Sequence, residues 1–332
     1  MRLNASEVGR AAAACGMLAA LLLTASCGGG EQQNNFLPAR IIAFGDETSV
    51  IVDTLGNGNG NKYGVNAVVS ASDPTIVCLG DPIWIQILAS AYPNIVFPQC
   101  NPGPSQVLDP QSRIRATFGA MAADLSSQVD TQVQESDFQS SDLVTVLVGV
   151  NDVIAQYLQY PGVPETTLNQ NLQIAGAAVG EQVNRIGDSG AKVIVSTIPD
   201  IGFSPFALSE KASHIDTDRQ LLIIRLVSVF NAALRNTINN DGHHIGLVTM
   251  DQQVDSSVQF VGFDGLTNVT DGVCDLGRSL LTPPSILDCT ELTLIPNGNS
   301  VTYLWADDRH LSLGGQTALG NLALTRARNN PF

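Results

Sequence analysis

Residues 39–53 read ARIIAFGDETSVIVD. The short apolar run from Arg40 to Phe44 ends in Gly45-Asp46, and a Gly-Asp pair after such a run is typical of the loop that ends a strand. Loops held by a rigid sheet are common places for reactive side chains. The stretch therefore predicts a strand followed by a polar turn, with an acidic residue, Glu47, at the position where a reactive group is expected.

The same pattern recurs along the chain, where short β-branched runs alternate with longer segments of helical periodicity. This alternation predicts a parallel sheet covered by helices. The predicted strands are Arg40 to Phe44, Leu143 to Val148, Lys192 to Ile198 and Ile245 to Met250. The predicted helices are Ile83 to Ala91, Met121 to Val133, the segment from Leu168 to Ile186, Arg219 to Ile238, and a last helix from just after Ser312 to about Arg328.

Two long stretches, Asp53 to Pro82 and Asp251 to Asn299, do not fit this alternation. Both are rich in Gly, Asn, Asp, Ser and Pro, which favour turns over regular elements. Loops at the carboxyl ends of strands form the binding crevice of an open α/β sheet. We therefore expect the two insertions to form the rim that selects a substrate.

The length and composition favour one large domain. The chain has 332 residues, is 44% hydrophobic and carries a formal net charge of −15. That apolar fraction is enough for a sizeable core. The negative charge disfavours nucleic acid and an anionic membrane surface as direct partners.

The first 27 residues are predicted to be an export signal, since two arginines flank a polar start and an apolar run from Ala11 to Leu23 follows. Residues 23–27, LTASC, resemble a bacterial lipobox, which predicts lipidation of Cys27 and attachment to the membrane through a lipid anchor only. Gly28 in place of Asp favours the outer membrane. Ordinary secretion to the periplasm or the outside is the alternative. Residues 28–38 are then a flexible tether, and 39–332 the folded domain.

Four cysteines remain outside the export segment: Cys78, Cys100, Cys274 and Cys289. An even number in an exported chain suggests two disulfides, for which three connectivities exist. Pairing within each loop, Cys78 with Cys100 and Cys274 with Cys289, is the simplest choice. A metal site is disfavoured because no Cys-x-x-Cys and no suitably spaced His accompany them.

Three polar blocks can carry chemistry: Gly45-Asp46-Glu47, Gly149-Val150-Asn151-Asp152 and Asp307-Asp308-Arg309-His310. Asp307 lies three residues before His310, so its carboxylate can fix one imidazole nitrogen and leave the other as a base. The Asn151 amide can stabilise a developing oxyanion. Taken singly, each block also has an ordinary explanation as turn or capping chemistry.

In their order along the chain, these blocks resemble the SGNH, or GDSL, hydrolase family. They correspond to its Gly-Asp-Ser start, its Gly-x-Asn-Asp block and its Asp-x-x-His block. Residues 113–129, RIRATFGAMAADLSSQV, resemble the block whose glycine donates a backbone N–H to the oxyanion, and Gly119 is the best match. Residues 82–92, PIWIQILASAY, and 261–274, VGFDGLTNVTDGVC, add to the likeness, which covers about residues 40–325.

The resemblance implies a flavodoxin-like, three-layer α/β/α sandwich that hydrolyses carboxylic esters of lipids, small acyl groups or acetylated glycans without a cofactor or metal. It makes His310 the base and Asp307 its orienting partner. Gly119 and Asn151 join the backbone N–H of residue 47 in the oxyanion hole. The nucleophile position falls on Glu47, where the family has Ser.

Four interpretations of this replacement follow. Ser49, two residues further on, replaces the missing hydroxyl. Alternatively, Glu47 and His310 activate water directly, without an acyl-enzyme. In a third, the pocket binds its ligand without turnover, as an inactive ligand-binding envelope lipoprotein, and in a fourth the role is purely structural. A carboxylate at residue 47 opposes the oxyanion electrostatically. We therefore expect Glu47 to rest against a protonated His310 and to fill the donors itself.

Overall fold

The structure is a computed structural model that describes residues 36–103, 106–239, 243–262 and 264–329. The predicted export segment, Cys27 and the tether up to residue 35 lie outside these residues. Phe36 already packs against the core of the domain. Within the described part of the chain, no helix is both long and apolar enough to cross a membrane.

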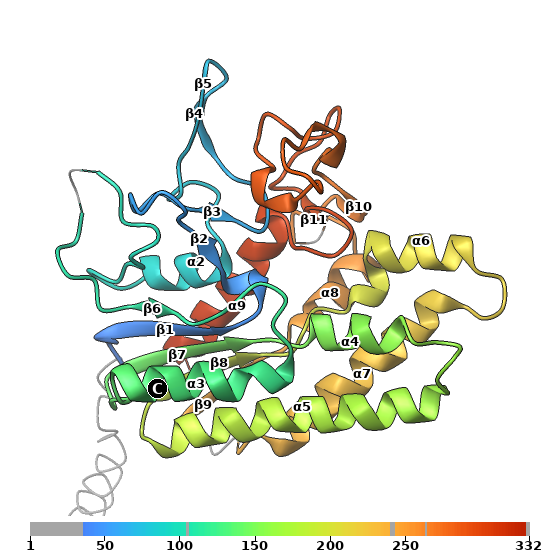
Figure 1. Cartoon of the computed structure of the whole chain (residues 1–332), viewed down its shortest axis with the longest axis horizontal. Coiled ribbons are helices and arrows are strands. Elements are labelled where there is room, and N and C mark those ends of the chain that lie inside the picture. The colour runs from blue at the N-terminus through green and yellow to red at the C-terminus, as the bar shows by residue number, and fades with distance from the viewer. Residues whose placement is uncertain (1–35, 104–105, 240–242, 263, 330–332) are drawn as a thin grey trace, which may run out of the picture. The chain divides into compact units, whose positions relative to one another are not determined.

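The core is a five-stranded, all-parallel sheet in the order β6-β1-β7-β8-β9 (Figure 1). Its strands are β1 (Arg40–Gly45), β6 (Arg113–Ile114), β7 (Asp142–Leu147), β8 (Lys192–Ser196) and β9 (Ile245–Val248). Counted by their succession along the chain, the strands lie in the order 2-1-3-4-5, which is the flavodoxin-like arrangement. β1 and β7 are nearly continuous apolar runs because both faces of the sheet are covered.

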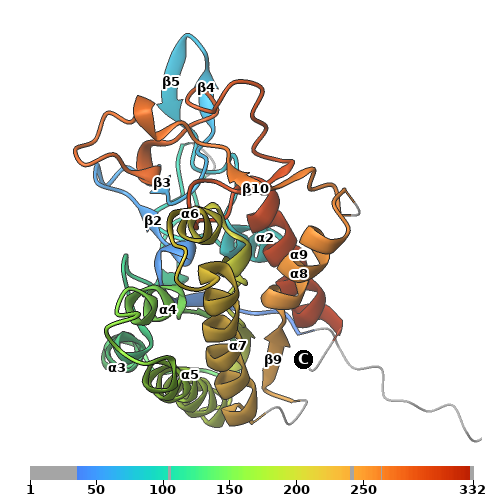
Figure 2. The ribbon, with the colours of Figure 1, turned by 90° about the vertical axis from the view of Figure 1, so that its right-hand side faces the viewer.

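Helices cover both faces, which gives the three predicted layers (Figures 1 and 2). One face is covered by α2 (Trp84–Ser90) and α9 (Leu313–Asn329), with α8 (Met250–Gln259) beside α9. The other is covered by α3 (Leu125–Glu135), α5 (Glu165–Asp188) and α7 (Arg219–Thr237), against which α4 (Val150–Tyr157) and α6 (Pro205–Ser213) pack.

The elements predicted from periodicity are confirmed in type, with small shifts at their ends. β8 ends at Ser196 and β9 at Val248, each earlier than expected. The expectation that the stretch from Asp251 lacks regular structure is wrong at its start, because α8 occupies it as far as Gln259. This helix buries only Met250, Val254 and Ser257, too sparse a pattern to stand out in the sequence.

The two insertions carry the short strands that stand clear of the main sheet in Figure 1. These are β2 (Ile51–Val52), β3 (Asn61–Lys62), β4 (Val68–Ser70) and β5 (Asp73–Ile76) in and beside the first, and β10 (Asn268–Gly272), which pairs with β11 (Tyr303–Trp305), in the second. The sequence-local disulfides are confirmed: Cys78 is bonded to Cys100 and Cys274 to Cys289.

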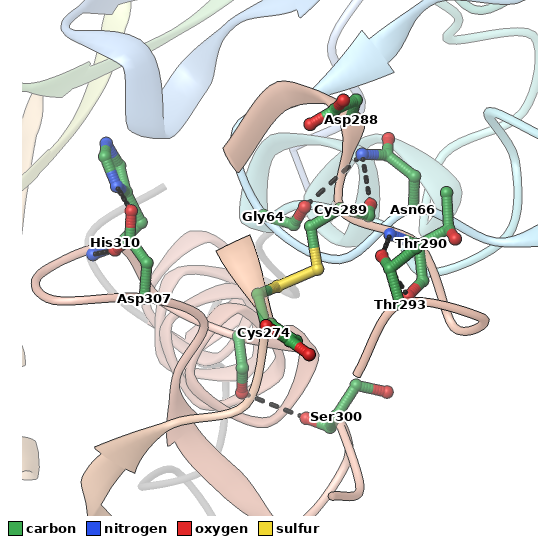
Figure 3. The surroundings of a disulfide bond; sticks show 12 residues. Gly64, Asn66, Cys274, Asp288, Cys289, Thr290, Thr293, Ser300, Asp307 and His310 are labelled. Carbon is green, nitrogen blue, oxygen red and sulfur yellow. Dashed lines mark hydrogen bonds and ion pairs between the residues drawn. A yellow bond between two sulfur atoms is a disulfide. The ribbon is translucent and has the colours of Figure 1, made fainter. Parts of the chain in front are cut away.

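Asn66 connects the first insertion to the second (Figure 3). Its backbone N–H and its side-chain Nδ2 both donate to the carbonyl oxygen of Cys289, each at 3.0 Å. The side chain is fully buried, so these bonds satisfy groups that water cannot reach. The Cys274–Cys289 loop is thereby fixed beside the Asp307–His310 pair.

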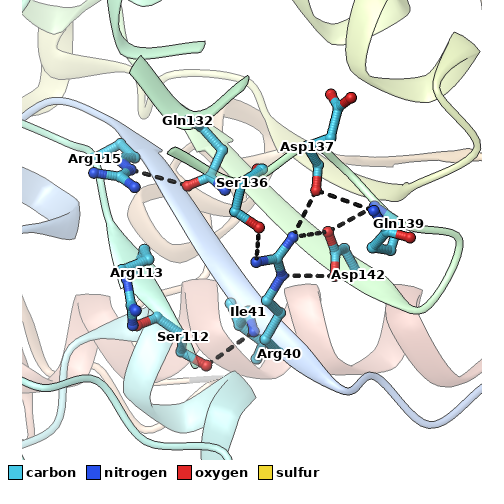
Figure 4. A network of polar contacts seen from close by, with 10 residues as sticks. All are labelled: Arg40, Ile41, Ser112, Arg113, Arg115, Gln132, Ser136, Asp137, Gln139 and Asp142. Atoms are coloured by element: carbon cyan, nitrogen blue, oxygen red, sulfur yellow. Dashed lines mark hydrogen bonds and ion pairs between the residues drawn. The ribbon is translucent and has the colours of Figure 1, made fainter. Parts of the chain in front are cut away.

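An ion pair fixes the start of the two central strands, at the end of the sheet opposite Glu47 (Figure 4). The Arg40 guanidinium donates to both carboxylate oxygens of the buried Asp142 at 2.8 Å. It also donates to Ser136 Oγ and to the carbonyl of Asp137. This two-pronged contact aligns β1 with β7 from their first residues.

Lys62 in the first insertion gives a test of how that loop is held. Its fully buried ammonium donates to the carbonyl oxygens of Cys78 (3.1 Å), Gly80 and Asp81 (2.9 Å). Burial lowers the pKa of Lys62 to about 8, against an opposing pull from Asp81, so the group is mostly charged at neutral pH. Lys62→Met keeps most of the length of the side chain but removes the donor from three carbonyls. The Cys78 carbonyl still accepts from Gln86 Nε2, whereas those of Gly80 and Asp81 lose their donor.

We expect Lys62→Met to lower the free energy of unfolding by about 2–4 kcal/mol, measured by urea titration. Lys211→Met, at an exposed lysine on α6, is the matched control and should leave stability nearly unchanged. Equal stabilities of the two variants would contradict a supporting role for the buried ammonium.

Candidate active site

The candidate site lies where the strand order reverses, at the carboxyl ends of β1 and β7. In open α/β sheets this reversal opens a crevice between neighbouring strands. Gly45 ends β1 at a φ of 125°, and a Cβ there would stand 1.8 Å from the Leu147 carbonyl oxygen. Gly149, after β7, has a φ of 134° and lies against the ring of Phe230. Both turns therefore require glycine.

Asp46 shapes the turn that carries Glu47. Its carboxylate caps a short 3-10 turn, Glu47–Ser49, by accepting from the backbone N–H of Thr48 at 3.0 Å. Its own N–H donates to the Leu147 carbonyl at 3.0 Å. Asp46 thus fixes the direction in which the Glu47 side chain leaves the sheet.

The Glu47 carboxylate is buried and its two oxygens have different partners. Oε2 accepts from the backbone N–H of Gly119 at 2.9 Å and from Nδ2 of Asn151 at 3.0 Å. Oε1 lies 3.5 Å from Nε2 of His310, which is an ion-pair distance but too long for a well-formed hydrogen bond. Glu47 therefore occupies two of the three predicted oxyanion donors itself, those of Gly119 and Asn151.

The two donors are held in place by their own neighbours. Gly119 has a φ of 73° in the loop after β6, and Asn151 lies in the first turn of α4. Asn151 Nδ2 also donates to the Ala120 carbonyl at 3.1 Å, and the buried Asp152 accepts from the Ala122 N–H at 2.9 Å. These bonds join the Gly119 loop to the start of α4, so the donors form one rigid cradle.

Asp307 and His310 form the predicted pair. His310 Nδ1 lies 2.7 Å from Asp307 Oδ2, and the backbone N–H groups of Arg309 and His310 donate to Asp307 Oδ1. This arrangement makes Nδ1 the donor to Asp307 and turns Nε2 toward Glu47. Asp307, Asp308 and His310 lie close enough to be considered as metal ligands, but Asp307 and His310 already use their facing atoms on each other.

Electrostatics keeps this centre charged. Burial opposes the imidazolium, yet the carboxylates of Asp307 and Glu47 outweigh it and raise the pKa of His310 to about 10. Burial likewise works against the two carboxylates, but His310 and backbone N–H donors lower the pKa of Glu47 and of Asp307 to about 2. The resting site is a carboxylate–imidazolium–carboxylate row in which His310 holds a proton at neutral pH.

Ser49 does not lie at this centre. Its side chain is fully buried, and Oγ accepts a hydrogen bond from Nε1 of Trp84 at 3.0 Å. The 3-10 turn directs Ser49 toward α2 while Glu47 faces His310. The structure thus brings together Glu47, Gly119, Asn151, Asp307 and His310, and leaves the displaced-nucleophile candidate in the core.

An aromatic wall beside the site has no counterpart in the sequence predictions. Tyr63, from the first insertion, stacks on Phe118 with ring centroids 4.9 Å apart and faces the His310 ring at 6.3 Å. Burial and the nearby Glu47 raise the pKa of the Tyr63 hydroxyl. Phe118 is 64% exposed although it adjoins Gly119. The position of Phe118 directly before Gly119 was the one feature of the sequence that could have indicated this wall.

The second insertion also reaches the site. A cavity of ≈ 450 Å³ opens beside Asp307 and Asp308, and Phe206, Gly272, Cys274 and Leu276 are among its lining residues. Cys274 begins the Cys274–Cys289 loop and Leu276 lies within it. Residues from both insertions therefore lie next to the Asp307–His310 pair, in agreement with their expected place at the rim of the site.

The fold and this centre are those of an SGNH-type hydrolase. The chain belongs to the family of GDSL-like lipases and acylhydrolases, which matches residues 41–323. Hydrolase or esterase activity is thereby supported at the level of the family.

Three relatives illustrate the likeness. Phosphatidylcholine-sterol acyltransferase of Aeromonas hydrophila is 27% identical over 197 residues, which are 57% of this chain and 54% of that protein. The matched part thus spans about half the length of that relative. An acetylxylan esterase of Geobacillus stearothermophilus is 14% identical, with 89% of this chain and 97% of that one covered and a TM-score of 0.43. A lipolytic G-D-S-L protein of Veillonella parvula is 12% identical, with 86% and 96% covered and a TM-score of 0.40.

The charged row predicts a particular dependence of stability on pH. The folded-state pKa of His310 lies above its ordinary value of 6.5, so its stabilising contribution is complete below pH 6.5 and is lost as pH rises toward about 10. The free energy of unfolding should fall over this window in the wild type and fall less in His310→Gln. Urea titrations at several pH values measure the slope.

His214→Gln, at an exposed histidine on the surface, is the control and should keep the wild-type slope. Identical slopes for the wild type and His310→Gln would contradict the charged row.

Proposed function

We propose that this protein hydrolyses carboxylic esters at the Glu47 centre, and that Glu47 itself holds this activity low in the resting state. The observation that carries the proposal is the convergence of two oxyanion-type donors and an Asp307–His310 pair on one carboxylate. An ester carbonyl needs the two donors that Glu47 Oε2 now occupies. The side chain must therefore swing aside before an ester can be polarised.

Once Glu47 has moved, each remaining group has a role. Gly119 N–H and Asn151 Nδ2 hold the oxyanion that forms on the ester carbonyl. The displaced carboxylate takes a proton from a water molecule, which attacks the carbonyl carbon directly, and His310 donates its proton to the leaving alkoxide. The proton on Glu47 then passes to His310, which restores the resting pair. No acyl-enzyme forms, because Ser49 is buried away from the centre.

Acyl esters of lipids are the substrate class we favour. The similarity to a phosphatidylcholine-sterol acyltransferase supports lipid acyl esters. The exposed Phe118, stacked on Tyr63, offers an apolar surface beside the reacting centre. Small acyl esters and acetylated glycans are the remaining classes of the family expectation.

We also propose that the protein is exported and carries a lipid on Cys27. The two disulfides support this placement, since such bonds persist in oxidising compartments outside the cytoplasm. Replacement of Cys27 by Ala should release the protein from the membrane fraction, as seen by fractionation of the expressing cells.

The ester proposal is tested with para-nitrophenyl butyrate. The wild type should hydrolyse it slowly, and Glu47→Ser should raise kcat/KM at least about 100-fold, because two donors are freed and a hydroxyl replaces the carboxylate. The gain should vanish in the double variant Glu47→Ser/His310→Gln.

Ser49→Ala serves as the control for the displaced hydroxyl and should match the wild type. Loss of wild-type activity in Ser49→Ala would refute the assignment of the centre to Glu47.

Ligand binding without turnover is the second candidate function. It is favoured because Glu47 occupies the Gly119 and Asn151 donors that an ester carbonyl would need. It predicts no wild-type hydrolysis of any ester tried, together with a rise in Tm when a non-hydrolysable ether analogue is added. Glu47→Ser should still gain activity in that case, because the rest of the centre is complete.

A further inference from the structure

The two oxygens of Glu47 are set up for different tasks. Oε2 accepts two hydrogen bonds within the cradle of Gly119 and Asn151. Oε1 faces His310 Nε2 at 3.5 Å, which is longer than a well-formed hydrogen bond. A carboxylate bound through one oxygen only keeps the other as a nucleophile.

We propose that Glu47 Oε1 attacks the saturated carbon of an epoxide and that this centre hydrolyses epoxides through a covalent ester on Glu47. This activity goes beyond ester hydrolysis and does not depend on it. It uses Glu47 where the structure places it, whereas ester hydrolysis requires the side chain to move.

The chemistry of the carboxylate favours a saturated carbon over an acyl carbon. Attack on an ester carbonyl would give a mixed anhydride, which is a high-energy product. Attack on a saturated carbon gives an ordinary ester between the substrate and Glu47. The carbonyl oxygen of that ester is Oε2, which already lies between the two donors that stabilise an oxyanion.

The first step opens the ring. Oε1 forms a bond to one epoxide carbon, the C–O bond of that carbon breaks, and the ring oxygen takes the proton from His310 Nε2, directly or through one water molecule. The products of this step are a hydroxyalkyl ester of Glu47 and a neutral imidazole. Asp307 keeps the imidazole ring in place through Nδ1.

The second step releases a diol. Neutral His310 takes a proton from water, and the resulting hydroxide attacks Cδ of Glu47. Gly119 and Asn151 hold the oxyanion on Oε2. Collapse breaks the bond between Cδ and the alkyl oxygen, which takes the proton from His310, and the remaining acid proton of Glu47 returns to His310. The net reaction adds one water to the epoxide and restores the resting pair.

An epoxide fits the site better than an alkyl halide. A departing halide leaves as an anion and takes no proton, so it would not use the acid that His310 supplies. A departing epoxide oxygen needs a proton, and the imidazole facing Oε1 supplies one. The stacked rings of Tyr63 and Phe118 beside His310 favour an aromatic substituent on the epoxide.

The test is a single turnover of para-nitrophenyl glycidyl ether in water enriched in heavy oxygen, with enzyme in excess. We expect the diol of this first turnover to contain no heavy oxygen, because its new oxygen comes from Glu47. The peptide that contains Glu47 should gain one heavy oxygen, detected by mass spectrometry. Heavy oxygen in the first diol would overturn the proposal, as would the absence of any diol.

Three variants sharpen the result. Glu47→Gln should form neither diol nor adduct. His310→Gln should form the adduct far more slowly and release no diol from it, since the ring oxygen then lacks a proton donor and water lacks a base. Glu181→Gln, at an exposed carboxylate on α5, should behave as the wild type. An adduct that survives in Glu47→Gln, or one formed from bromohexane but not from the epoxide, would refute the epoxide assignment.

The outcome is separable from the ester proposal. Ester turnover is measured on para-nitrophenyl butyrate in the same preparation. A wild type that is inactive on the ester but transfers a light oxygen to the diol would remove the first proposal and leave the second intact.

Discussion

The centre depends on the contacts made by the buried Glu47 carboxylate. This carboxylate joins four segments that are far apart in sequence: the end of β1, the loop after β6, the start of α4 and the loop before α9. Each hydrogen bond to a charged group contributes about 1.5–3 kcal/mol. Burying the carboxylate costs free energy, and these contacts together with the imidazolium offset that cost. The same contacts fix the geometry from which any reaction must start.

Much of the fold is predictable from local sequence because the strands and long helices carry strong periodic patterns. β1, β7, β8 and β9 were found from β-branched runs, and α5 and α7 from apolar spacing. β6 has two residues and α8 buries few apolar groups, so neither shows such a pattern. The position of β6 at the sheet edge depends on pairing with β1, which is a tertiary effect that no local window contains.

The sequence predicts those residues of the site that can be recognised by their side-chain type and their spacing. Asp307 and His310 interact three residues apart, so their contact is visible in the sequence. Gly119 acts through a backbone N–H and leaves no chemical signature, so only resemblance to a family located it. The direction of Ser49 depends on a single 3-10 turn, and the Tyr63–Phe118 wall on the path of a long loop. Sequence patterns specify neither the direction of Ser49 nor the position of the Tyr63–Phe118 wall.

The cradle itself does not discriminate between a substrate oxygen and an oxygen of the protein. Two N–H donors stabilise negative charge on whichever oxygen lies between them, and here that oxygen belongs to residue 47. A Ser at this position would leave the donors to the substrate and make the enzyme an acyl-transfer catalyst. In the proposed epoxide reaction, Glu47 makes its own carboxyl carbon the site of the tetrahedral intermediate. In that reaction, the one replacement would move the reacting acyl carbon from the substrate to the protein, while Asp307, His310 and both donors keep their places.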